Sequence, residues 1–232
     1  MLTSLTARFR HASPELKLFA GASLVFGMAY SIFDSVFNNY LNASFSLTGF
    51  QRSFLEFPRE LPGFLAVFAT ALVWFLSSRR LGALSLVLGV VGSLLIGFAS
   101  TSYPVMVLWL FIYSLGNHLL MPVATTIGME LARDGATGAR LGQLNALRNL
   151  ATILGSFIVF IGFRYLSMTF QHSFAIVAVL FAISAFLMFR IRPEKAQKPN
   201  SYLKLHREYR TYYLLAILFG SRKQLFFTFA PW

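Results

Sequence analysis

The chain has 232 residues, of which 56% are hydrophobic and only 12% are charged. In a soluble domain about a quarter of the residues are charged, so this composition, with its long apolar runs, excludes that class and predicts an all-α polytopic membrane protein. The formal net charge of +12 would suggest nucleic-acid binding in a soluble protein. Here the basic residues fall between apolar runs, and we predict no nucleic-acid partner. The absence of cysteine excludes disulfides and thiolate chemistry.

Six apolar runs are long enough to cross a bilayer as helices, which takes about 20 residues each. In chain order, the predicted spans are residues 18–41, 53–76, 81–99, 105–131, 141–165 and 173–190. The first run is too long for a cleaved signal peptide, so we expect it to be retained. We divide the chain into a six-span domain (1–190), a basic cytoplasmic linker (191–211) and a seventh apolar segment (212–232).

The distribution of Lys and Arg predicts the orientation of these spans. With the N-terminus inside, the outer loops hold only Arg52 and Arg164, and the other basic residues outside the spans, up to the end of the linker, fall on the inner side. The positive-inside rule therefore places both ends of the six-span block in the cytoplasm. We expect the protein in a bacterial cytoplasmic membrane.

Polar residues form stripes on four of the six spans. The third and sixth spans have no charged residue in their interiors. A helix that is apolar all round suits contact with lipid, whereas a single polar stripe suits the interior of a bundle. We therefore predict that spans 1, 2, 4 and 5 line a polar cavity and that spans 3 and 6 pack outside. The stripes include Tyr30, Asp34 and Asn38 in span 1, Arg52, Glu56, Arg59 and Glu60 in span 2, and Tyr113, Asn117, Met121 and Thr125 in span 4.

Two of these stripes should meet at a similar depth. Span 1 runs outward and span 2 returns, so we predict that Arg59 pairs with Asp34 or with a carboxylate of its own span, such as Glu56. Such a network could serve transport or could simply hold the bundle together. Asn117 and the neighbouring His118 could equally make ordinary hydrogen bonds between helices.

The fifth span carries the most distinctive stripe, on which Asn145, Arg148 and Asn149 lie on one helical face with Thr152 and Ser156. A guanidinium inside an apolar helix is costly in lipid and needs a partner or a water-filled cavity. No carboxylate in the six spans is obviously at the depth of Arg148. We therefore expect it to be available to an anion or to a partner outside these spans.

The six spans also suggest an internal repeat of three plus three. Spans 1 and 4 both place Asn near a helical Tyr, and spans 2 and 5 both open with an Arg followed by small residues. The two halves would run in opposite directions through the membrane. Inverted repeats of this kind occur in secondary transporters.

Two cytoplasmic segments carry a resemblance to a known family. The turn Glu130-x-x-Arg133-x-Gly135-x-x-Gly138-x-Arg140-x-Gly142 leads into Leu150 to Gly155, and the loop Ser77-Ser78-Arg79-Arg80-Leu81-Gly82 follows span 2. Together they resemble the N-terminal half of a major facilitator superfamily transporter. The loop lacks the Asp and the first Gly of the family's G-x-L-x-D-R-x-G-R-R pattern. Gly155 is followed by Ser156 and Phe157 rather than by the antiporter pattern, which favours symport or facilitated transport.

The resemblance implies twelve helices in two six-helix halves, with the present chain a half-length fragment that ends within helix 7. It implies alternating access to a small solute, with the C-terminal half or a second copy as partner, and a gating role for the cytoplasmic loops. Our candidate cavity residues are Asp34, Asn38, Arg59, Asn117, Arg148 and Arg222, with Asp34 or Glu56 as the proton-coupling group. The candidate gating residues are Arg79, Arg80, Glu130, Arg133 and Arg140.

Two other readings compete with a transporter. The chain could be a non-transporting half protein or the product of a degraded gene. An intramembrane enzyme is the third possibility, but we find no H-E-x-x-H motif, no second intramembrane Asp to pair with Asp34, and no G-x-S-x-G elbow around Ser114 and His118. We therefore predict neither an enzyme nor a cofactor or metal site.

Overall fold

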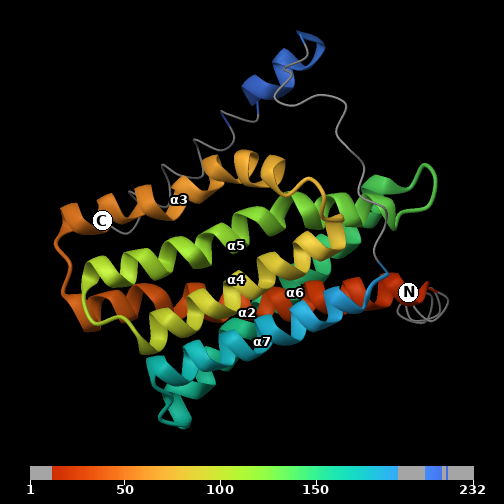
Figure 1. Ribbon diagram of the computed structural model, residues 1–232. Coiled ribbons are helices and arrows are strands. Elements are labelled where there is room, and N and C mark those ends of the chain that lie inside the picture. Colours follow the sequence, from red (N-terminus) through yellow and green to blue (C-terminus); the bar gives the residue numbers. More distant parts are fainter. Residues whose placement is uncertain (1–11, 193–206, 216–217, 219–232) are drawn as a thin grey trace.

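The computed structural model describes residues 12–192, 207–215 and 218, and within them the chain is all α-helical with no strand. Six long helices lie side by side in an elongated bundle (Figure 1). A short 3-10 helix η1 (Arg207–Tyr209) continues into helical residues 210–215, at the junction of the predicted linker and seventh segment. The six helices are α2 (Pro14–Phe45), α3 (Gly49–Leu72), α4 (Ser78–Phe98), α5 (Tyr103–Glu130), α6 (Thr137–Tyr165) and α7 (Phe170–Arg190).

Hydroxyl side chains fix where four of these helices begin. Ser13, Thr48, Ser77 and Thr169 each accept a hydrogen bond from a backbone N–H of the first turn of the helix that follows. Such caps satisfy backbone donors that have no partner inside the helix. At Thr48 the Gln51 side chain accepts the reciprocal bond from the cap residue, and this completes a capping box.

Two predicted boundaries are wrong. Span 2 was expected to reach residue 76, but α3 ends at Leu72 and a turn follows, because Ser77 caps the next helix. The charged turn before span 5 is shorter than expected, since Gly138 and Arg140 already lie in α6. Gly135 turns the chain there with φ of 72°, a left-handed conformation that suits glycine.

Five of the six helices are long and apolar enough to cross a membrane, and they identify the chain as an integral membrane protein. The exception among the six is α3, whose first half holds Arg52, Glu56, Arg59 and Glu60. Its role as a sixth span stays a prediction. At the end of α7 the Arg190 guanidinium lies 5.8 Å from the centroid of the Phe186 ring. There its apolar stem can cover the helix while the charge reaches out, as in side chains at a membrane surface.

The helices pack in a defined set of pairs. The central helix α2 packs against α6 and α7, the central helix α5 packs against α3 and α4, and α4 also packs against α7. Helices α5 and α6 touch only sparsely. Helices α4 and α7 expose apolar side chains, but they do not pack outside the bundle as predicted, because each packs against two other helices. The helices with the fewest neighbours are α3 and α6, because each packs mainly on a single central helix.

Close approaches hold these pairs together. A Cβ atom added at Gly92 of α4 would lie 2.6 Å from backbone atoms of Tyr113 in α5, and one added at Gly155 of α6 would lie 2.8 Å from the carbonyl oxygen of Met28 in α2. The Phe33 and Tyr113 rings stack with centroids 3.7 Å apart and join α2 to α5. The two central helices thereby fix the positions of the polar residues that they carry.

Candidate functional site

A cluster of charged side chains joins α2, α3 and α5 near the middle of these helices. The Arg59 guanidinium lies 3.3 Å from Asp34 Oδ1 and 3.6 Å from Glu56 Oε1. The predicted pairing of Arg59 with Asp34 and with a carboxylate of its own helix is therefore confirmed. We call the group formed by Asp34, Glu56, Arg59, Glu60 and His118 the acidic cluster.

Helix α3 contains two prolines where it enters this cluster. Pro58 and Pro62 stand one turn apart on either side of Arg59. Each proline lacks an N–H and so leaves the carbonyl four residues earlier without its helical donor. The hydroxyl of Ser114 in α5 donates to the carbonyl oxygen of Arg59 itself. This bond ties the proline-flanked turn of α3 to the adjacent central helix.

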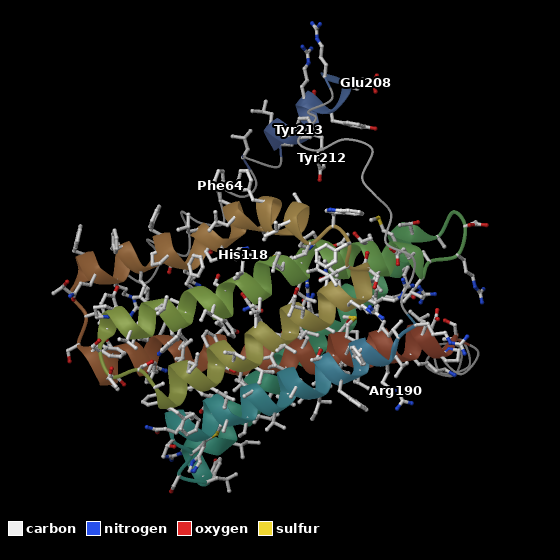
Figure 2. All side chains as sticks on the ribbon, in the orientation of Figure 1. Phe64, His118, Arg190, Glu208, Tyr212 and Tyr213 are labelled. Carbon is white, nitrogen blue, oxygen red and sulfur yellow. The ribbon has the colours of Figure 1, made fainter. Side chains whose placement is uncertain are left out.

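The sequence analysis did not predict a third pair in the cluster, between His118 and Glu60. His118 Nε2 lies 3.6 Å from Glu60 Oε2, and the imidazole fits against α3 because a Cβ at Gly63 would lie 2.9 Å from its Nδ1. His118 sits between α5 and α3, whereas Phe64 points away from the bundle (Figure 2). With a neutral imidazole, the three carboxylates and one guanidinium of the cluster give a net charge of −2.

A matching pair of serine contacts links each central helix to an outer one. The Ser31 hydroxyl of α2 donates to the carbonyl oxygen of Thr152 in α6 at 2.7 Å. In the same way, the Ser114 hydroxyl of α5 donates to the carbonyl oxygen of Arg59 in α3. Both serines belong to the same short pattern, Tyr30-Ser31-x-x-Asp34 in α2 and Tyr113-Ser114-x-x-Asn117 in α5. Comparing the two central helices residue by residue would have revealed this pattern in the sequence.

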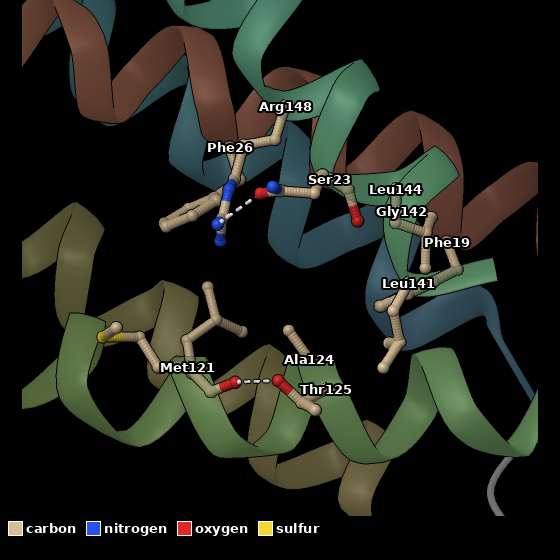
Figure 3. A pocket seen from close by; sticks show the side chains of 12 residues that line it. Phe19, Ser23, Phe26, Met121, Ala124, Thr125, Leu141, Gly142, Leu144 and Arg148 are labelled. Carbon is tan, nitrogen blue, oxygen red and sulfur yellow. Dashed lines mark hydrogen bonds between the residues drawn. The ribbon is translucent and has the colours of Figure 1, made fainter. Parts of the chain in front are cut away.

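Arg148 lies apart from the acidic cluster, in a pocket of about 390 Å³ between α2, α5 and α6. Its guanidinium points into the space beside Phe26 and faces Met121, Ala124 and Thr125 on the opposite helix (Figure 3). Arg148 Nη2 donates to Asn145 Oδ1 at 3.0 Å. We call this space the Arg148 pocket. Among the described residues, those that line this pocket come from α2, α5 and α6, so the prediction that α3 would also line such a cavity is wrong for this pocket.

The candidate gating residues gather at one end of the bundle, which we call the basic end. Arg79, at the start of α4, is buried and lies 3.0 Å from Glu130 at the end of α5. Arg140 Nη1 donates to Gln143 Oε1 at 3.0 Å within α6. Arg80 and Arg133 are exposed. Two of the five predicted residues are thus brought into contact across helices, which ties the loop before α4 to the end of α5.

The remaining candidate residues are not brought together. Asn38 is exposed on α2, one turn beyond Asp34. Asn117 is partly buried, and its Nδ2 donates to the backbone oxygen of Tyr113, 3.3 Å away in the same helix. Arg222 lies outside the described residues. The structure therefore assembles Asp34, Glu56 and Arg59 in one place and Arg148 in another.

Within the described residues, no three acidic or histidine side chains converge closely enough to hold a metal ion. Comparisons of the chain with protein-family models and with curated proteins give no match. Function must therefore be inferred from the acidic cluster, the Arg148 pocket and the arrangement of the helices around them.

Proposed function

We propose that the chain is part of a secondary transporter of the major facilitator type, which moves a small solute across a bacterial cytoplasmic membrane by alternating access. The observation that carries the proposal is the duplicated arrangement of the helices. If α2, α3 and α4 are matched in order with α5, α6 and α7, the main packing pairs correspond to one another. The pair α2–α6 then corresponds to α5–α3, and the pair α2–α7 corresponds to α5–α4.

The serine contacts support the same correspondence at the level of single residues. Ser31 and Ser114 occupy the same place in their Tyr-Ser patterns, and each binds a backbone carbonyl of the outer helix that packs on its own central helix. Successive halves of three helices each would enter the membrane from opposite sides. This is the inverted repeat from which many secondary transporters are built, with their binding sites at the repeat interface.

The position of the charges supports transport over a purely structural bundle. Arg59 and Arg148 lie near the middle of α3 and α6, where ionisable residues are costly and usually face a partner or an aqueous path. The opposing wall of the path would come from a second six-helix unit, either elsewhere in a longer chain or in a second copy. The Arg79–Glu130 contact would then close the basic end in one of the two alternating states.

Proton coupling would use the acidic cluster. The cluster has three carboxylates and one guanidinium, so its negative charges outnumber its positive charge. It can therefore take up a proton when the surrounding water is excluded. Protonation of Asp34 would weaken its hold on Arg59 and change the contact between α2 and α3, whereas protonation of Glu56 would loosen a pair within α3 and leave Arg59 to Asp34. Binding of a proton and a change in helix packing would thereby be linked, as symport requires.

The test is uptake by the native product, reconstituted in liposomes after its intact mass in its own membrane has been measured. With a pH dye inside and an inward proton gradient, a panel of small solutes should contain at least one whose addition accelerates proton entry. Asp34→Asn should abolish this coupling, whereas Arg164→Gln, at the far end of α6, should not. Folded protein that moves no solute, with or without the gradient, would overturn the proposal. Unchanged transport and pH dependence in Asp34→Asn would exclude Asp34 as the coupling group.

A further inference from the structure

We propose that the Arg148 pocket binds small organic monoanions, namely carboxylates with an apolar or aromatic body. This inference rests on the proposed transport function and names the substrate class for it. It depends on the charge at Arg148, on the walls of the pocket and on the sparse contact between α5 and α6 that leaves the space between them.

Arg148 is not neutralised within the part of the chain that the structure describes. There, Arg59 pairs with Asp34 and Glu56 and Arg79 pairs with Glu130, but no carboxylate pairs with Arg148. Its Nη2 is held by the neutral Asn145 side chain. A guanidinium at this depth in an apolar helix calls for an anion, and its planar fork suits the two oxygens of a carboxylate.

The walls of the pocket limit the chemistry of the ligand beyond its carboxylate. The pocket is lined mainly by apolar side chains, including Phe19, Phe26, Leu120 and Met121, and two hydroxyl groups lie on opposite helices at Ser23 and Thr125. Sites of this kind bind the apolar part of a ligand by burial and orient it through a few polar groups. The volume of about 390 Å³ lies in the range of sites that bind small molecules.

The single charge of the pocket limits the charge of the ligand. Among the described residues that line the pocket, Arg148 is the only charged one. One guanidinium balances one negative charge, whereas a phosphate ester carries nearly two and would need a further cation or several more donors. The pocket therefore favours a carboxylate over a phosphate, and it opposes a cation.

The experiment measures binding directly, so that it does not depend on transport. Equilibrium dialysis of radiolabelled benzoate is carried out with the purified native product in lipid nanodiscs, with benzamide and benzylammonium as neutral and cationic competitors. Benzoate should bind and should not be displaced by either competitor. Arg148→Gln should weaken binding roughly 10- to 100-fold, as expected when one charge-assisted pair is removed. Arg148→Lys, which keeps the charge but loses the fork, should weaken it less.

The matched control is Arg164→Gln, the same substitution on the same helix at an Arg that is exposed, as Arg148 is, but does not line the pocket, and it should bind benzoate as the parent does. Melting temperature and gel filtration establish that each variant is folded.

Benzoate binding that survives in folded Arg148→Gln, or displacement by benzylammonium, would overturn the inference. So would failure of the folded parent to bind benzoate and longer monocarboxylates alike. Anion binding at Arg148 without any solute transport would support the binding site and contradict the transport function. Transport of cations alone, unaffected by Arg148→Gln, would support the transport function and contradict the binding site.

Discussion

The acidic cluster and the Arg148 pocket lie in the same bundle, yet they balance their charges in opposite ways. In the acidic cluster a guanidinium is shared by two carboxylates on two helices, and a third carboxylate meets an imidazole. In the Arg148 pocket a guanidinium meets a neutral amide and apolar walls. A paired charge stabilises helix contacts and can respond to protonation, whereas a charge without an acidic partner is available to a ligand.

The comparison predicts that Arg59 is far more important for stability than Arg148. Arg59→Gln would leave Asp34 and Glu56 facing each other without a cation, and we expect it to lower the free energy of unfolding by about 2 kcal/mol. This is less than the roughly 3–5 kcal/mol of a fully buried pair, because Asp34 is half exposed. Titration of unfolding with SDS, followed by circular dichroism, measures the change.

A double-mutant cycle sharpens this result. In Arg59→Gln combined with Asp34→Asn, one of the two uncompensated carboxylates is removed, so part of the lost stability should return. Equal stability of Arg59→Gln and the parent would show that the ion pairs in α3 contribute nothing to packing. The acidic cluster would then not differ from the Arg148 pocket in the way the structure indicates.

The next largest effect on stability is expected at the contact between α6, which carries Arg148, and α2, which carries Asp34. In Gly155→Ala the new Cβ would lie 2.8 Å from the Met28 carbonyl oxygen, and neither backbone can yield without separating α2 from α6. We expect a loss of about 1–2 kcal/mol, typical of overpacking. Gly138→Ala is the matched control on the same helix. It meets nothing within 4 Å and should leave stability unchanged or raise it slightly. Equal effects of the two variants would contradict the close approach at Gly155.

A smaller effect tests the correspondence between the two halves. Ser31→Ala removes two bonds from α2 to α6, one to the Thr152 carbonyl oxygen and one to the Ser156 hydroxyl, and Ser114→Ala removes one bond from α5 to α3. Each variant should lower the free energy of unfolding by about 0.5–1 kcal/mol per bond lost. Ser93→Ala is the control, because the Ser93 hydroxyl binds only carbonyls of its own helix at Gly89 and Val90. A loss in one of the two variants alone would argue against an equivalent role of the two serines.

The sequence was sufficient for what depends on period and composition. Apolar runs located all six helices to within a few residues. The spacing of charged residues correctly limited the partners of Arg59 to Asp34 or a carboxylate of its own helix, because helical faces and the direction of each span follow from the chain alone. Contacts set by the lateral placement of helices could not be read in this way. The His118–Glu60 pair depends on the imidazole fitting over Gly63, and the exclusion of α3 from the Arg148 pocket depends on which central helix it packs against.

The smallest expected effect completes the comparison. Arg148→Gln removes a charge whose described contact is with a neutral Asn145, so the free energy of unfolding without ligand should change by less than about 0.5 kcal/mol. The same SDS titration as for Arg59→Gln provides the measurement. If Arg148→Gln instead destabilised the protein as much as Arg59→Gln does, Arg148 would have to be paired with a carboxylate of a second six-helix unit, and the pocket would be an interface between units. A change near zero, together with a loss of benzoate binding, would separate the two arginines into one that holds the helices together and one that binds a ligand.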